Sequence, residues 1–374
     1  MKWLPKFRFS MRTLFILVTL VCLALIWFRM IRHRAEQQKI AVTWVLGTGG
    51  RVSYDYQRQH EVYAIFSRDE PTDKLWLRSK LGNDFFDTVE QVKWNGKAVH
   101  DLSHLIQLPG LKIIDLFDTD VESLEPLSQL RNLEAITIYG GSITDISPLA
   151  KLMKLKVVDL RGSNVTDVSH LSNIPALRRV YWDDSQIASA STLPNLDNIE
   201  AVEVELHFQE NLLYVTKFNC PVCLTLYTQM MDDLSPLEEI PHLISLYLEG
   251  DNISDISFLA NQNNLNSLEL NASSVTDFSP LLKLEQLDHL QFHSNTLTNL
   301  EIIAKLKTLE SMSLTTPKVT DLSPLHNLAN LEYLSLINMK VPQEEILKLQ
   351  KKFPACQIKE YQFSNRFYPL NTPN

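Results

Sequence analysis

The sequence lacks the motifs that mark most catalytic sites. It has only ten glycines in 374 residues, and Gly47–Gly50 matches no phosphate-binding loop spacing. No G-x-S-x-G nucleophile motif, no H-E-x-x-H metal motif and no carboxylate pair outside the repeats is present. The sequence therefore predicts a protein that is not an enzyme and that uses no cofactor and no small-molecule substrate.

Cysteine is scarce, with four residues in the chain. Cys220 and Cys223 are the one pair with metal or redox spacing, but zinc needs four ligands and no second Cys or His pair matches. A thioredoxin-like site needs cysteines at the start of a helix, whereas Cys223 falls at the entry to an expected strand. We expect an inert or structural pair and no bound metal; a local disulfide and a redox or metal site are the alternatives.

Positive charge is also scarce outside the N-terminus. The net charge is −9, although the residues before Glu36 carry seven Lys and Arg and no acid. The remainder is therefore strongly acidic, which argues against nucleic acid as a partner.

One long uncharged apolar run is present, TLFILVTLVCLALIWF at residues 13–28. It spans about 24 Å as a helix, and an extension to residues 11–31, with Arg12 and Arg29 reaching the interfaces, would cross a bilayer. The sequence predicts a single-pass anchor over residues 1–34. The alternative is a cleaved signal peptide, but no small-x-small cleavage site follows the run.

The rest of the chain is organised around a 22-residue repeat, of which Ile143–Asn164 is one copy. Stepping by 22 from Val158 and Leu160 gives thirteen apolar pairs, from Val92/Trp94 to Cys356/Ile358, without a register shift. Residues at i and i+2 of a strand share a face, so each coil should add one parallel strand to a sheet. One such coil cannot stand alone, so the stack needs neighbours and caps.

Each coil should return through a short turn. Ser147-Pro148, repeated at three later coils, predicts a helix start with serine as N-cap, and only enough residues follow for a 3₁₀ turn. Asp145 and its counterparts should form Asx turns. The coil between Val204 and Leu224 lacks this pattern, so its return arm should differ while the strands continue.

The pattern L-x-x-L-x-x-L-x-L-x-x-x-x-[IV]-[ST]-D-[IV]-S-P-L resembles bacterial leucine-rich-repeat proteins of the internalin-like, 22-residue class. The block RFSMRTLFILVTLVCLALIWF also resembles leaders of planctomycete membrane-anchored proteins. The resemblance implies an α/β-type solenoid: a horseshoe or arc of about 12–13 coils, with 3₁₀ turns on the convex side and helical caps at both ends.

We expect five segments from this pattern. Residues 1–34 are the anchor, 35–88 an N-terminal cap, 89–341 the repeat array, 342–360 a capping helix with the last strand, and 361–374 a loose tail. In the capping helix, Ile346, Leu347 and Phe353 should face inward.

The candidate binding surface is the concave face of the sheet. Side chains that flank the core positions there form an acidic stripe with tyrosines, which suits a basic or extended protein partner. The alternative is a solvated face that happens to be acidic. We predict a membrane-tethered binding protein with an extracytoplasmic body; a cytoplasmic adaptor remains open. The candidate residues are Asp115, Phe117, Tyr139, Asp159, Arg161, Tyr181, Asp183, Glu203, Glu205, Tyr227, Tyr247, Glu249, Glu269, His289 and His293.

Overall fold

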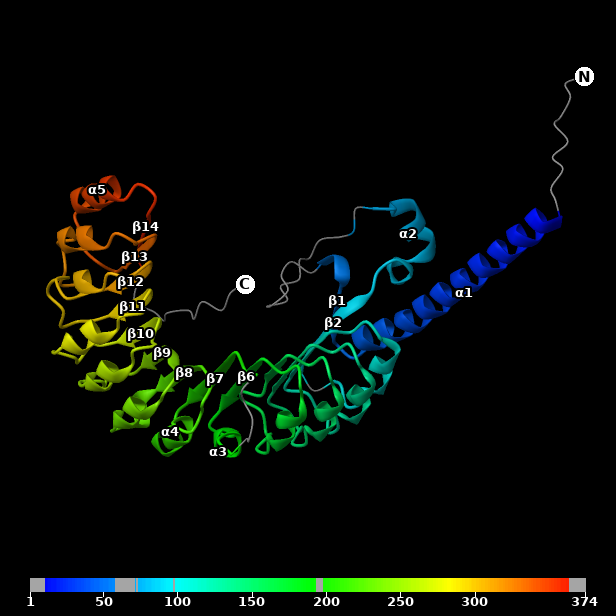
Figure 1. Ribbon diagram of the computed structural model, residues 1–374, viewed down its shortest axis with the longest axis horizontal. Helices are drawn as coiled ribbons and strands as arrows, with labels where there is room; N and C mark the ends of the chain where they lie inside the picture. Colours follow the sequence, from blue (N-terminus) through cyan, green and yellow to red (C-terminus); the bar gives the residue numbers. More distant parts are fainter. Residues whose placement is uncertain (1–10, 58–70, 72, 97, 193–197, 363–374) are drawn as a thin grey trace, which may run out of the picture.

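The computed structural model describes the chain except residues 1–10, 58–70, 72, 97, 193–197 and 363–374. One fourteen-stranded sheet follows the chain order from β1 to β14 and lines the inner side of an arc (Figure 1). All neighbouring strands are parallel except β1 and β2. The strands are β1 (Arg51–Tyr54), β2 (Val89–Asn95), β3 (Ile113–Phe117), β4 (Ala135–Tyr139), β5 (Val157–Asp159), β6 (Arg179–Asp183), β7 (Ala201–Leu206), β8 (Val222–Tyr227), β9 (Leu243–Glu249), β10 (Ser267–Asn271), β11 (His289–His293), β12 (Ser311–Thr315), β13 (Tyr333–Ile337) and β14 (Gln357–Tyr361).

Short helices form the convex side, as expected (Figure 1). Most coils return through a 3₁₀ turn, including Ser103–Gln107, Glu125–Gln129, Ser147–Lys151, Ser169–Asn173, Ser235–Glu239, Ser257–Asn261, Ser279–Lys283, Ile303–Lys305 and Ser323–Asn327. The α-helices are α1 (Met11–Gly47), α2 (Leu75–Leu81), α3 (Ile187–Ala190), α4 (Gln209–Val215) and α5 (Gln343–Lys352). These features confirm the leucine-rich-repeat solenoid that the repeat predicts.

The core is one continuous column of apolar side chains, most of them aliphatic. Val158 and Leu160 are fully buried, as are Leu149 and Leu155 on the return arm of the same coil. Each coil is stacked between two neighbouring coils, which remove these side chains from water. A fully buried aliphatic side chain contributes roughly 1.5–3 kcal/mol of transfer free energy.

Most of the turns are built by an aspartate and not by the serine that follows it. The backbone N–H of Ser147 donates to Oδ1 of Asp145 at 2.8 Å, which confirms the Asx turn. The expected serine N-cap is wrong, because Ser147 is already the first residue of the 3₁₀ turn and makes no side-chain capping bond there. The aspartate two residues earlier satisfies that N–H instead.

The strand register departs from the 22-residue step by two residues at two places, and a one-residue irregularity lies between Val222 and Cys223 where β8 pairs with β9. Val204 pairs with Leu224, 20 residues on, and Leu334 pairs with Ile358, 24 residues on. The expectation of an unbroken register, with Cys356 and Ile358 as the last pair, is therefore wrong. A longer α-helix replaces the 3₁₀ turn in both coils, α4 in the first and α5 in the second, whereas the coil that contains the four-residue α3 keeps the 22-residue step. Each shift is two residues, and the same side chains still face the core.

The irregular coil behaves as its sequence indicates. Helix α4 replaces the aspartate-serine-proline turn, while β7 and β8 remain paired. Helix α5 closes the other end as expected, but its inward face differs. Ile346 and Leu349 are buried and Leu347 is 61% exposed. The buried side chains follow a helical i, i+3 spacing, which turns Leu347 to solvent.

Helix α1 runs unbroken across the expected boundary between anchor and cap. Its first part is exposed, and it is the one helix of the described chain that is long and apolar enough to cross a membrane. Its last turns are buried against the array through Ala41, Val42 and Val45. The expected five-part division of the chain stays a prediction.

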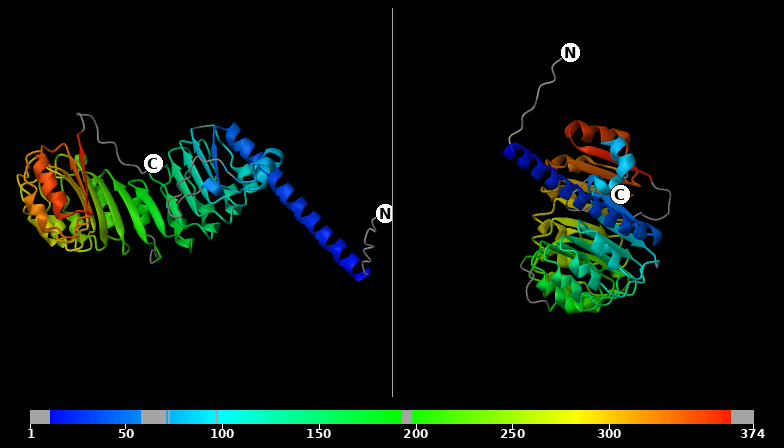
Figure 2. Two further views of the ribbon diagram at one scale, coloured as in Figure 1. Left: turned by 90° about the horizontal axis from the view of Figure 1, so that it is seen from above. Right: turned by 90° about the vertical axis from the view of Figure 1, so that its right-hand side faces the viewer.

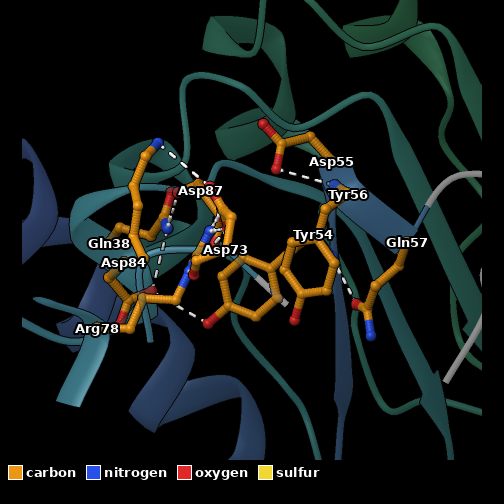
Figure 3. Close-up of polar contacts among 10 residues, drawn as sticks. Gln38, Tyr54, Asp55, Tyr56, Gln57, Asp73, Arg78, Asp84 and Asp87 are labelled. Atoms are coloured by element: carbon orange, nitrogen blue, oxygen red, sulfur yellow. Dashed lines mark hydrogen bonds and ion pairs between the residues drawn. The ribbon is translucent and has the colours of Figure 1, made fainter. Parts of the chain in front are cut away.

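A buried polar cluster ties α1 to the cap (Figure 3). Gln38 of α1 donates to the backbone oxygen of Asp87 at 2.9 Å and to Oδ1 of Asp84 at 3.0 Å. Arg78 of α2 binds both carboxylate oxygens of Asp87, and its Nη2 lies 2.7 Å from Oδ1 of Asp73. These bonds connect α1, α2 and the chain that enters β2.

Candidate partner-binding face

The residues that alternate with the core positions point to the concave side of the sheet. The strand pairing places Glu203 beside Tyr181 on one flank and beside Cys223 on the other. Glu205 lies between Asp183 and Thr225. Because of the register shift, the residues of β8 that lie beside these two glutamates are two positions earlier in the sequence than the repeat predicts.

The first part of this face, on β5 to β7, is an ion-paired group around Arg161. Its Nη2 lies 2.8 Å from Oδ2 of Asp159, and its Nη1 lies 3.9 Å from Oε2 of Glu205. Burial disfavours the charged guanidinium, but these carboxylates outweigh it and raise the pKa of Arg161. The guanidinium also covers the ring of Tyr181 at 4.8 Å from its centroid. Tyr181 is therefore buried, and a partner would meet Arg161 instead.

The second part, on β8 and β9, is aromatic. The rings of His207 and Tyr227 stack with 4.6 Å between centroids and 8° between planes, and Tyr227 meets Tyr247 edge-on at 6.4 Å. Tyr247 donates to Oε2 of Glu249 at 2.7 Å. Burial, with Glu205 and Glu249 nearby, raises the pKa of Tyr227. Both phenols therefore stay protonated at neutral pH.

The third part continues the acidic stripe onto β10 and β11. Burial, and then the charge of Glu249, raise the pKa of Glu269 to about 7, although Gln291 donates a hydrogen bond to its carboxylate. A shallow hollow of about 330 Å³ lies beside it, lined by Glu249, Asp251, Asn252 and Asn271 among others. Carboxylate and amide side chains therefore line this part of the face.

The ends of the face are more dispersed. Near β3, the ammonium of Lys93 lies over the Phe117 ring at 4.6 Å, and Tyr139 is 48% exposed. Burial raises the pKa of Asp115, which accepts a hydrogen bond from Gln91 at 2.7 Å. At β11, His289 and His293 lie at the two ends of one strand, and burial lowers the pKa of the second. Asp115, Phe117 and Tyr139 nevertheless adjoin the first part: the rings of Phe117 and Tyr139 lie 6.1 Å apart, and the charge of Asp159 contributes to the raised pKa of Asp115.

Sequence reasoning missed Lys93, His207 and Gln291. Lys93 lies beside the candidate Asp115 on the next strand, and Gln291 lies beside the candidate Glu269. Both are one 22-residue step from a candidate, so the repeat could have identified them. The repeat did not point to His207, because each residue of β7 pairs with a residue of β8 that lies two positions earlier in the sequence than the 22-residue step gives.

Cys220 and Cys223 do not form an activated thiol pair. Burial raises the pKa of each thiol to about 11, so both are protonated at neutral pH. Cys220 packs in the core cluster, and Cys223 lies beside Glu203 on the concave face. A reactive cysteine needs a lowered pKa, and this environment does the opposite.

The architecture decides the fold class. The chain has the leucine-rich-repeat fold. Solved structures that it resembles include an internalin from Listeria monocytogenes, at 24% identity over 71% of this chain and 78% of that one with a TM-score of 0.47. Internalin C2 from the same species matches at 20% identity over 68% and 82%, TM-score 0.23. A leucine-rich-repeat protein from Leptospira interrogans matches at 14% over 72% and 88%, TM-score 0.34.

Two further comparisons found nothing. No protein-family model matches the chain, and no curated protein matches it significantly.

Proposed function

We propose that this protein is a membrane-tethered, non-enzymatic binding protein that holds a basic protein segment on its concave face. The observation that carries the proposal is the combination of Tyr227, Tyr247 and Glu249 with Glu205 and Glu269 on adjoining strands. Tyrosine offers a large contact area with few rotatable bonds, and carboxylates beside aromatic rings suit an arginine or lysine side chain.

Helix α1 supports the tether. Residues 11–31 would cross the bilayer, and the body would lie on the extracytoplasmic side, since long C-terminal domains are translocated largely regardless of flanking charge. A reporter fused to the C-terminus and active on only one side of the membrane tests this orientation. Activity on the cytoplasmic side would favour the adaptor alternative.

Photo-crosslinking tests the binding face. A photoreactive amino acid at Tyr227 of the full-length chain should form adducts with a partner, and the same group at Met153, which is 63% exposed, should not. Comparable adducts at both positions would show that binding does not use the concave face.

Charge reversal then tests the acidic character. In the chain with the photoreactive amino acid at position 227, Glu205→Lys with Glu249→Lys should abolish the adduct. Without this charge reversal, higher salt should lower the adduct yield. The matched control is Glu238→Lys with Glu239→Lys, which changes the charge equally on an exposed convex turn. If both double variants behave alike, the face does not select a basic partner.

A further inference from the structure

Helix α2 presents an apolar and basic surface that no other described part of the cap covers. Trp76 is 66% exposed and Leu81 is 43% exposed. The ammonium of Lys80 lies 5.7 Å from the centroid of the Trp76 ring, and Lys74 is exposed just before the helix. Tryptophan and lysine favour the membrane interface, where the indole ring lies among head groups and the ammonium reaches phosphates.

Ring contacts place α2 at the end of the candidate membrane span. Phe85, just after α2, contacts Phe28 of α1 with 5.7 Å between ring centroids, and it meets Phe86 edge-on at 5.1 Å. Arg78 of α2 lies over the Phe86 ring at 5.2 Å. Phe28 is the last residue of the uncharged apolar run. Figures 1 and 2 both show α2 beside the middle of α1.

The position of α2 along the span is fixed. Helix α1 is continuous from Met11 to Gly47, so no hinge separates the apolar part from the part packed on the array. Ala35 and Gln38 are buried, and Gln38 donates hydrogen bonds to Asp84 and to the backbone oxygen of Asp87 in the cap. When the apolar part crosses a bilayer, α2 therefore lies at the level of the head groups on the side of the body.

Charge at this level opposes the charge of the rest of the body. Arg29, Arg32 and Arg34 follow the apolar run on α1. Lys80 lies within α2, and Lys74 precedes it with its ammonium 3.3 Å from Oδ2 of Asp73. The chain as a whole has a net charge of −9. Anionic lipids attract basic residues that lie close to the membrane surface.

We propose that α2 is a second membrane contact, in which Trp76 and Leu81 enter the head-group region and Lys74 and Lys80 bind the phosphates of anionic lipids. This inference rests on the proposed membrane anchoring. The contact limits rotation of the array about the anchor, so that the concave face keeps one orientation to the membrane.

Site-directed labelling of the full-length chain tests the contact. In a Cys22→Ser background, a fluorophore is attached at Trp76→Cys or at Met153→Cys, two positions of similar exposure. The chain is reconstituted in phosphatidylcholine vesicles with a nitroxide quencher on the head group, with or without phosphatidylglycerol. Several-fold stronger quenching is expected at position 76, and more with phosphatidylglycerol. Circular dichroism confirms that both variants fold.

Charge variants separate the lipid contact from simple proximity. Lys74→Glu with Lys80→Glu should remove the effect of phosphatidylglycerol at position 76, while Lys351→Glu with Lys352→Glu, on the exposed side of α5, should leave it. Equal, weak quenching at positions 76 and 153 in a chain that floats with the vesicles would overturn the second contact and leave the anchor intact. A chain that does not float with the vesicles would overturn both.

Discussion

The phenol of Tyr247 donates a hydrogen bond to Oε2 of Glu249 at 2.7 Å, so two side chains of one strand hold each other in place on the concave face. Burial, and then the bond and charge of Glu249, raise the pKa of Tyr247 above its ordinary value. Tyr247→Phe should lower the free energy of unfolding by about 1 kcal/mol, a typical net value for one hydrogen bond. It should also remove one late-ionising tyrosine from an alkaline absorbance titration.

The control for this change is Tyr139→Phe, since Tyr139 is 48% exposed. Its substitution should change the free energy of unfolding less than Tyr247→Phe does. Equal effects of the two substitutions would show that Tyr247 is not held by Glu249 in solution.

Glu269 should give the stability of the protein a pH dependence near neutrality. Its pKa is raised to about 7 by burial and by Glu249, above the ordinary glutamate value of 4.5. Between these two values the folded chain binds more protons at this site than the unfolded chain, so the contribution of this group to stability falls as pH rises from about 4.5 to 7. Glu269→Gln should flatten this slope in denaturant titrations at a series of pH values.

The matched control for the pH series is Glu239→Gln, on an exposed convex turn. It removes the same charge without the burial that raises the pKa of Glu269. If the slope of stability against pH persists unchanged in the Glu269→Gln variant, other titratable groups cause it.

Arg78 is expected to be the most sensitive residue of the N-terminal cap. Its side chain is 7% exposed and pairs with Asp87, whose side chain is equally buried. Arg78→Met should leave that carboxylate buried without its cation, which costs about 3–5 kcal/mol. Backbone amides of β1 and β2 should exchange faster with deuterium, while those of β10 to β13 should not.

The double variant Arg78→Met with Asp87→Asn should recover much of this loss, because no unpaired charge then remains buried. If the backbone amides of β1 and β2 exchanged faster in the double variant than in Arg78→Met alone, the destabilisation by Arg78→Met would not come from the unpaired charge of Asp87.

The repeat predicted the fold well because each coil reuses one pattern of buried residues. Val158 and Leu160 could be placed in the core from spacing alone. The register shifts at Leu224 and Ile358 could not, because a shift of two residues keeps the same face inward and leaves the apolar pattern intact. Periodicity reports which face a residue lies on, and not which residue lies beside it.

The same limit applies to the candidate face. Alternation identified Glu203 and Tyr227 as outward-pointing residues. It could not show that Arg161 covers Tyr181, because this long side chain pairs with Asp159 of β5 and also extends over β6 toward Glu205 of β7. Side-chain length and charge, and not the period of the strand, decide which groups a partner can touch.

Leu268 tests how far a defect spreads along the stack. It is 1% exposed and lies between Leu246 and Leu290 on the neighbouring strands. Leu268→Ala should lower the free energy of unfolding by about 2–5 kcal/mol, from lost transfer free energy and the cavity left behind. Because each coil contacts mainly its neighbours, hydrogen exchange should accelerate in β9, β10 and β11 and change least in β2 and β3.

The matched control makes the same chemical change on the convex surface. Leu282 is 39% exposed in the turn between β10 and β11, so Leu282→Ala removes the same atoms and opens a smaller cavity. Its effect on unfolding should stay well below that of Leu268→Ala. If exchange accelerated equally in every strand of the Leu268 variant, the array would unfold as one cooperative unit and the nearest-neighbour description of its stability would be wrong.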